Sequence, residues 1–126
     1  MPVTGGDPTT PLIAPRDANY QQVYAAGKAI ASAPLPVQIA LIRANLRQGG
    51  TFDFQRDNVR QETQPAYANA SNYAVGVYMA GAGYSLPLAR GMAETYALFN
   101  SSNYGAKNQA AWLEQGWRDA NSGRWK

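Results

Sequence analysis

The chain contains no cysteine and no histidine among its 126 residues. Without cysteine there are no disulfides, thiol nucleophiles or thiolate metal sites, and the fold does not depend on the redox state of its compartment. Without histidine the chain lacks the commonest general base and the commonest transition-metal ligand. Papain-like proteases, serine-histidine triads and zinc hydrolases are therefore excluded. Any catalysis must use carboxylate, guanidinium, ammonium, phenol, hydroxyl, amide or backbone groups, and we expect no metal and no cofactor.

Charge is also sparse, because only 15% of the residues are charged and 11 basic against 8 acidic side chains give a net charge of +3. The basic residues are scattered along the chain, so charge alone permits an anionic polymer as a partner without requiring one. No run approaches the roughly 18 consecutive apolar residues that span a bilayer. The first residues lack the basic flank and apolar run of a signal peptide. We expect no stable membrane span and no Sec-type export.

Residues 1–16 have the composition of a flexible linker or tail. They include Pro2, Pro8, Pro11 and Pro15, together with two adjacent glycines. Such a segment favours extended, unpacked chain. The remainder, residues 17–126, has enough apolar content for one modest core, and we expect it to form a single helical domain.

The apolar spacing predicts a mainly α fold, a compact bundle of about five helices with one short extended segment near residues 51–55. Asp17 is the expected cap of the first helix, which ends before Pro34 and Pro36. The expected later helices cover residues 35–48, 72–83, a segment after the cap Ser85, and 107–120. The residues expected to face inward are Tyr20, Val23, Gly27 and Ile30, then Leu35, Ile39, Ile42 and Leu46, then Leu88, Met92, Tyr96 and Phe99, and finally Ala110, Leu113 and Trp117.

The segment 72–83 carries no charge and consists largely of small residues. We expect a buried central helix in which Gly76, Ala80 and Gly83 let neighbouring backbones approach closely. The alternative is a re-entrant hairpin formed with the following helix, since twelve residues are too few to cross a membrane alone.

Asp53 is the first candidate catalytic residue. It lies between Phe52 and Phe54 in the sequence TFDFQ, where desolvation would raise the pKa of its carboxyl toward a range useful for general acid or base catalysis. Arg56 is the natural partner, because a guanidinium either lowers that pKa or binds a phosphate or carboxylate. The alternative interpretation is an Asp that accepts backbone hydrogen bonds in the turn at Gly49 and Gly50.

A second group of candidates precedes and opens the neutral helix. Amide and phenol groups gather there, and a helix starting at Asn72 would attract an anion to its N-terminus. Helix capping and core packing are the alternative roles. The candidate catalytic residues are Asp53, Arg56, Tyr67, Asn69, Asn72 and Tyr73, and the candidate substrate-binding residues are Gln55, Arg60, Glu62 and Glu94.

The remaining carboxylates have simpler interpretations. We expect Glu94 to form a surface ion pair with Arg90, four residues earlier, and Glu114 and Asp119 to lie on the exposed side of the last helix. Glu94 keeps a second interpretation, because a pair of carboxylates on either side of a glycosidic bond, Asp53 with Glu62 or Glu94, would suit a sugar-cleaving site.

The sequence GGTFDFQ followed by YANASNYAVG resembles the bacterial polymorphic toxin type 44 domain, from about Asn19 to Gly116. That family shows Gly-Gly, an aromatic-Asp-aromatic-Lys signature, and a Tyr-x-Asp-x-Gly-Asn-aromatic-x-Tyr-Gly motif that opens a small-residue helix. The chain departs from these motifs at four positions, which hold Gln55, Asn69, Ser71 and Val75 where the family has Lys, Asp, Gly and Tyr.

The resemblance implies an effector domain that is secreted and delivered into a target bacterium, with its cytoplasm favoured over its periplasm. It further implies a carrier or secretion-apparatus protein attached through the N-terminal linker and a cognate immunity protein. From the residues, a metal-independent ribonuclease is the favoured activity. The alternatives are a peptidoglycan glycan hydrolase, a membrane-perturbing effector and a structural adaptor of a secretion system.

Overall fold

The computed structural model describes residues 19–46, 68–95 and 105–126 as five helices. They are α1 (Tyr20–Ile30), α2 (Leu35–Leu46), α3 (Ala68–Gly81), α4 (Leu86–Thr95) and α5 (Gly105–Asn121). This part of the chain contains no strand, and the predicted mainly α bundle is confirmed. The linker at 1–16, the cap Asp17 and the extended segment at 51–55 lie outside the described residues.

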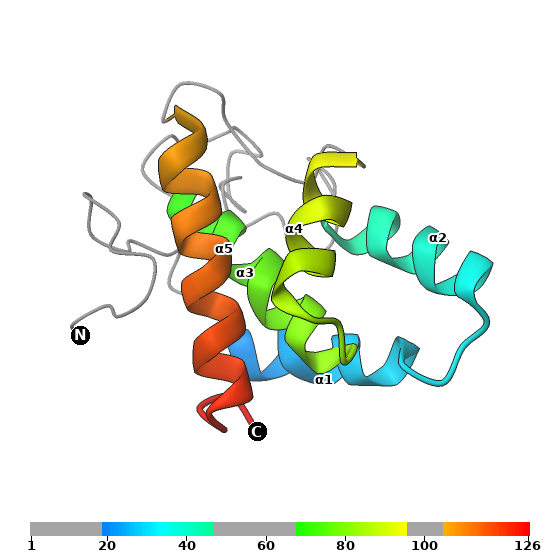
Figure 1. Cartoon of the computed structure of the whole chain (residues 1–126). Helices are drawn as coiled ribbons and strands as arrows, with labels where there is room; N and C mark the ends of the chain where they lie inside the picture. The colour runs from blue at the N-terminus through cyan, green and yellow to red at the C-terminus, as the bar shows by residue number, and fades with distance from the viewer. Residues whose placement is uncertain (1–18, 47–67, 96–104) are drawn as a thin grey trace, which may run out of the picture.

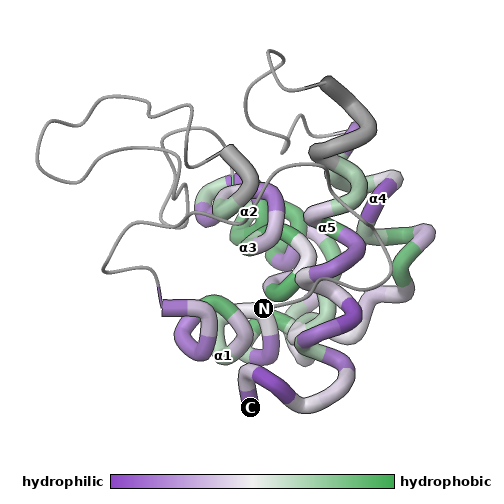
Figure 2. Tube along the Cα trace, turned by 90° about the vertical axis from the view of Figure 1, so that its left-hand side faces the viewer, coloured by the Kyte–Doolittle hydropathy of each residue, from purple (hydrophilic) through white to green (hydrophobic). Residues whose placement is uncertain are grey.

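Helix α3 is the centre of the bundle, and α1, α4 and α5 pack around it (Figure 1). From Ala70 to Ala80 every residue of α3 is buried. In Figure 2 the hydrophobic colour gathers along α3, while hydrophilic residues mark the outward side of α5. The predicted buried, neutral helix is therefore confirmed, although it begins at Ala68 rather than Asn72. None of the helices in the described ranges is long and apolar enough to cross a membrane.

Glycines set the distance between α3 and its two main neighbours. A Cβ built on Gly76 would overlap the Leu113 carbonyl oxygen of α5, and one on Gly116 would overlap the Tyr73 carbonyl oxygen of α3. Where α1 crosses α3, a Cβ on Gly27 would overlap the Tyr78 carbonyl oxygen, and a Cβ on Gly81 would overlap the Tyr24 carbonyl oxygen. Because each crossing has a glycine on both helices, backbone lies directly on backbone.

The predicted role of Gly83 in helix packing is wrong. A Cβ at this position would meet nothing within 4 Å, and its backbone φ is +85°. The Gly83 N–H donates to the Ala80 carbonyl at 3.0 Å and the Tyr84 N–H to the Met79 carbonyl at 3.1 Å. This is a Schellman motif, so Gly83 ends α3 by adopting the left-handed conformation that glycine permits.

The first helix has the predicted inward face, with Tyr20, Val23, Gly27 and Ile30 all buried. Its cap differs from the prediction, because the side chain of Asn19 accepts the Gln22 N–H at 3.1 Å. Asn and Asp are about equally good caps, so the sequence alone does not decide between Asp17 and Asn19. Ser85 caps α4 as predicted, since its Oγ accepts the Leu88 N–H at 3.3 Å.

Two predicted apolar stripes are wrong in part. In α4 the buried residues are Ala89 and Ala93, whereas Leu88 is half exposed and Met92 only partly buried. In α2 Ile42 and Leu46 are buried, as predicted, but Leu35 is 61% exposed. Small side chains let α4 lie close to the core, and they displace the larger ones outward.

The last helix buries Leu113 as predicted, but the other residues that it buries differ from the predicted ones. Trp112, Leu113, Gln115, Gly116 and Ala120 are buried, whereas Ala110 and Trp117 are intermediate. The Trp117 indole N–H donates to the Tyr84 carbonyl at 2.7 Å, and this bond ties α5 to the turn that follows α3.

Candidate functional site

The structure describes few of the predicted site residues. Asp53, Gln55, Arg56, Arg60, Glu62 and Tyr67 lie outside the described residues. Asn69 lies in the first turn of α3, but its side chain is not described. The described side chains are those of Asn72, Tyr73 and Glu94.

Residues 47–67 and 96–104 are not described, and the helix ends next to them in α3, α4 and α5 lie at one end of the bundle. Helices α3 and α5 begin, and α4 ends, at the upper end of the molecule in Figure 1. Asn69 near the start of α3 and Glu94 near the end of α4 are therefore at the same end. The segment 47–67, which holds most of the candidates, connects α2 to this start of α3.

The anion-binding argument for Asn72 is wrong in position. Because α3 begins at Ala68, Asn72 lies in the second turn and is 1% exposed. The free N–H groups and the positive end of the helix dipole belong to the first turn, which contains Asn69. An anion at this helix would therefore meet Asn69 rather than Asn72. The catalytic roles of both residues remain predictions.

Tyr73 joins α3 to the C-terminal end of α5. Its hydroxyl donates to Asp119 Oδ2 at 2.5 Å and accepts from the Trp125 indole N–H at 3.0 Å. The other Asp119 oxygen accepts from Gln115 Nε2 at 2.7 Å, and Arg124 Nη1 lies 3.1 Å from Oδ2. Asp119 thus has three side-chain partners, and the side chain is only 13% exposed. The prediction that Asp119 and Glu114 face solvent is wrong, since Glu114 is also only 19% exposed.

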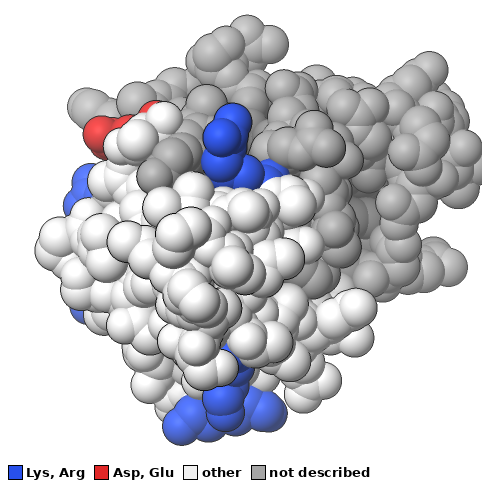
Figure 3. Space-filling model, turned by 90° about the vertical axis from the view of Figure 1, so that its right-hand side faces the viewer, with Lys and Arg blue, Asp and Glu red and all other residues white. Residues whose placement is uncertain are grey.

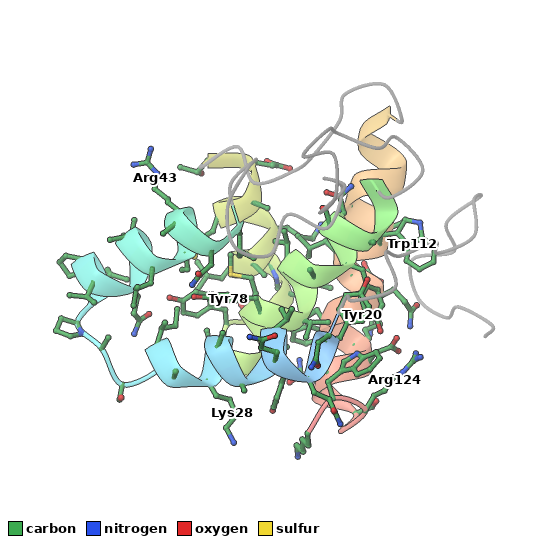
Figure 4. The ribbon with its side chains drawn as sticks, turned by 180° about the vertical axis from the view of Figure 1, so that it is seen from behind. Tyr20, Lys28, Arg43, Tyr78, Trp112 and Arg124 are labelled. Carbon is green, nitrogen blue, oxygen red and sulfur yellow. The ribbon has the colours of Figure 1, made fainter. Side chains whose placement is uncertain are left out.

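A second Schellman motif brings the C-terminal residues onto this cluster. Gly123 has a φ of +99°, its N–H donates to the Ala120 carbonyl at 3.1 Å, and the Arg124 N–H donates to the Asp119 carbonyl at 3.1 Å. The reversal places Trp125 against Tyr20, with ring centroids 5.2 Å apart, and the Arg124 guanidinium over the Trp125 ring at 4.6 Å. Figure 4 shows Tyr20 and Arg124 near this lower end of α5.

The geometry makes Tyr73 a hydrogen-bond donor. Its burial raises the pKa of the phenol well above its ordinary value, and the hydrogen bond to Asp119 raises that pKa further. Burial likewise raises the pKa of Tyr20, while the charge of Arg124 acts in the opposite direction. A phenol with a raised pKa stays protonated near neutral pH, so it can donate a hydrogen bond but is a poor nucleophile or base.

Glu94 differs from Tyr73 because it is exposed. The predicted Arg90–Glu94 ion pair is wrong: Arg90 Nη1 instead lies 3.9 Å from Glu114 Oε1, and Arg118 Nε lies 3.0 Å from the other oxygen of Glu114. Helix α5 therefore supplies the acidic partner of Arg90. The Glu94 carboxylate faces solvent at the end of the bundle where α3 begins.

Two buried polar atoms on α5 have no hydrogen-bond partner, Trp112 Nε1 and Gln115 Oε1. Both side chains are 1% exposed. The sequence analysis missed the roles of Asp119 and Trp125 because their partner Tyr73 lies 46 and 52 residues away, and it missed Gln115 because that side chain bonds Asp119 itself. The helix-ending Gly123 followed by Arg-Trp is the only local signal. The described residues contain no group of three or more acidic side chains that would hold a metal ion.

Comparison of the chain with known protein families, with curated proteins and with solved structures finds no match.

Proposed function

We propose that the chain is an interbacterial effector toxin domain that hydrolyses a polymer of the target cell without a metal, and that RNA is its substrate. The observation that carries this proposal is the ordered pair of motifs around Asp53 and Asn69. The scaffold is compatible with it, because the second motif leads directly into α3, the helix around which the bundle packs.

The chemistry follows from the residues available. Arg56 and Arg60 would bind the phosphodiester through guanidinium hydrogen bonds, which match phosphate geometry. The Asp53 carboxylate would accept the proton of the ribose 2′-hydroxyl as that oxygen attacks phosphorus. The 5′-oxygen leaves with a proton from a neighbouring acid such as the Tyr67 phenol. This transesterification gives a 2′,3′-cyclic phosphate and a 5′-hydroxyl, and water then opens the cyclic phosphate in the slower, hydrolytic step. Neither imidazole nor metal is required.

A peptidoglycan glycan hydrolase is the second candidate, and the position of Glu94 favours it. This carboxylate is exposed near the end of α4, and Arg90 pairs with Glu114 instead. An accessible carboxylate could then form the acid-base pair with Asp53 that glycoside hydrolysis uses.

Expression in a bacterium, with and without an added export signal, tests the proposal. For the ribonuclease we expect growth arrest only when the chain stays in the cytoplasm, and we expect Asp53→Asn to abolish it. Asp57→Asn is the matched control, because it removes a carboxylate from the same segment and should leave the arrest unchanged. Arrest only on export, lost in Glu94→Gln, would replace the ribonuclease with the glycan hydrolase. No arrest in either compartment would contradict both.

A further inference from the structure

Three aromatic rings at the C-terminal end of α5 form one group that reaches from the surface into the bundle. Tyr73 is 1% exposed, and its ring centroid lies 4.9 Å from that of Tyr20 and 6.3 Å from that of Trp125. The Trp125 ring is only partly buried, and its indole N–H donates to the Tyr73 hydroxyl at 3.0 Å. Aromatic rings this close exchange single electrons readily, so Trp125 connects the buried Tyr73 with the surface.

Tryptophan, tyrosine and cysteine are the side chains that lose a single electron most readily. The chain has no cysteine, whose thiolate would otherwise be oxidised first. Trp112 also contacts Tyr73, but it is 1% exposed. An oxidant in solution therefore reaches Tyr73 through the ring of Trp125 rather than through that of Trp112.

Tyr73 has a base in place for its proton. A tyrosine that loses an electron at neutral pH must also lose its hydroxyl proton, because the oxidised phenol is a very strong acid. The Tyr73 hydroxyl already donates to Asp119 Oδ2 at 2.5 Å, and a carboxylate can take up that proton. The Tyr20 hydroxyl instead donates to the Ala70 carbonyl at 3.4 Å, and a backbone carbonyl cannot take up a proton.

The charges around Trp125 disfavour a positive charge on its own ring. The Arg124 guanidinium lies over this ring at 4.6 Å. Figure 3 shows basic but no acidic colour at the lower end of the face on which α2 projects. If Tyr73 supplies an electron to the oxidised indole and its proton passes to Asp119, all three groups become neutral. The charge that remains is that of Arg124, whose side chain is 36% exposed to water.

We infer that Tyr73 is a redox site, at which a one-electron oxidant that acts on Trp125 leaves a neutral tyrosyl radical. The oxidant takes one electron from the Trp125 indole and is itself reduced by one electron. The indole radical cation then takes one electron from Tyr73, while the Tyr73 hydroxyl proton moves to Asp119 Oδ2. The sum converts a phenol and a carboxylate into a phenoxyl radical and a carboxylic acid, and it restores Trp125. This inference does not depend on the proposed hydrolase activity.

Pulse radiolysis of the full chain in azide solution tests the inference, because the azidyl radical takes one electron from tryptophan and becomes azide. We expect a fast phase in which the absorption of a tryptophan radical converts to that of a tyrosyl radical, at a rate independent of protein concentration. Tyr73→Phe should abolish this phase. Asp119→Asn keeps the shape of the side chain but cannot take up the proton, so it should slow the phase at least about hundredfold.

Tyr20→Phe is the matched control, because Tyr20 contacts both Trp125 and Tyr73 but donates its hydroxyl to a carbonyl. It should keep the fast phase, and all variants should keep their helical circular dichroism. Trp125→Phe changes a partly exposed residue beyond α5 and should remove the fast phase. A fast phase retained in Tyr73→Phe or in Trp125→Phe, or unchanged in Asp119→Asn, would overturn the inference. Its loss in Tyr20→Phe would also overturn it, because the electron would then come from Tyr20.

Discussion

Helices α2 and α3 are similar in their largely apolar composition and opposite in environment. Each is apolar on most sides, and α3 has no charged residue while α2 has one, Arg43. Yet α3 is buried on every side from Ala70 to Ala80, whereas the side of α2 that carries Val37, Ala40 and Leu41, here called its outer face, is exposed. The difference lies in the glycines: α3 has two where α1 and α5 cross it, and α2 has none. Close backbone approach allows neighbours on several sides of α3, while the larger side chains and inward amides of α2 leave it at the periphery.

The largest expected effect is at the crossing of α3 and α5. Gly76→Ala places a methyl group against the Leu113 carbonyl, so one backbone must move, and we expect a loss of about 3 kcal/mol or more in the free energy of unfolding. Urea denaturation measures it. Gly91→Ala is the control, because Gly91 in α4 faces open space and the added methyl should stabilise the protein by about 0.5–1 kcal/mol. Equal effects at the two positions would remove the distinction between α3 and the peripheral helices.

The next effect separates the two sides of α2. Ile42 is fully buried, so Ile42→Ala should cost about 2–5 kcal/mol in the free energy of unfolding through lost burial and a cavity. Leu41→Ala, on the outer face, should cost less than about 1 kcal/mol. The same denaturation experiment compares them. A Leu41→Ala cost as large as that of Ile42→Ala would mean that the outer face is covered within the chain itself.

Three buried tyrosines, Tyr20 of α1 and Tyr73 and Tyr78 of α3, predict a loss of stability at alkaline pH. Burial raises the pKa of Tyr20, Tyr73 and Tyr78 in the folded protein, whereas an unfolded tyrosine loses its proton near pH 10. Above pH 10 the folded state therefore holds more protons than the unfolded state, and the free energy of unfolding must fall as pH rises. Each such tyrosine contributes about 1.4 kcal/mol per pH unit in this window.

Tyr73→Phe isolates one of these contributions. Its slope of unfolding free energy against pH, measured by urea denaturation above pH 10, should be shallower than that of the original chain by about 1.4 kcal/mol per pH unit. An unchanged slope would contradict the buried, proton-retaining position assigned to Tyr73.

The smallest effect concerns the polar attachment of α2. Asn45→Ala removes the hydrogen bond to the Tyr78 hydroxyl, and we expect a cost of about 1 kcal/mol in the free energy of unfolding. Ala40→Gln, on the outer face, should change stability by less than about 0.5 kcal/mol. A neutral Asn45→Ala would show that the hydrogen bond between Asn45 and Tyr78 does not help to hold α2.

The sequence predicts the helices well where apolar residues recur on one face, as in α1, or where charge is absent throughout, as in α3. The inward face of α1 and the neutral stretch of α3 follow directly from spacing and composition. The stripe of α4 could not be predicted from hydrophobicity, because the bundle selects Ala89 and Ala93 for their small size. The position of Asp119 could not be predicted either, since Tyr73 reaches Asp119 only through the crossing of α3 and α5, and Trp125 reaches the Tyr73 hydroxyl only through the turn at Gly123. Of the candidate site, the structure describes only the part that belongs to helices.

The most direct test of the account is incubation of the purified chain with total RNA in the presence of a metal chelator. We predict cleavage to fragments with 2′,3′-cyclic phosphate ends, abolished in Asp53→Asn and retained in Asp57→Asn. Intact RNA at high protein concentration, or equal cleavage by both variants and the original chain, would contradict a hydrolase centred on Asp53.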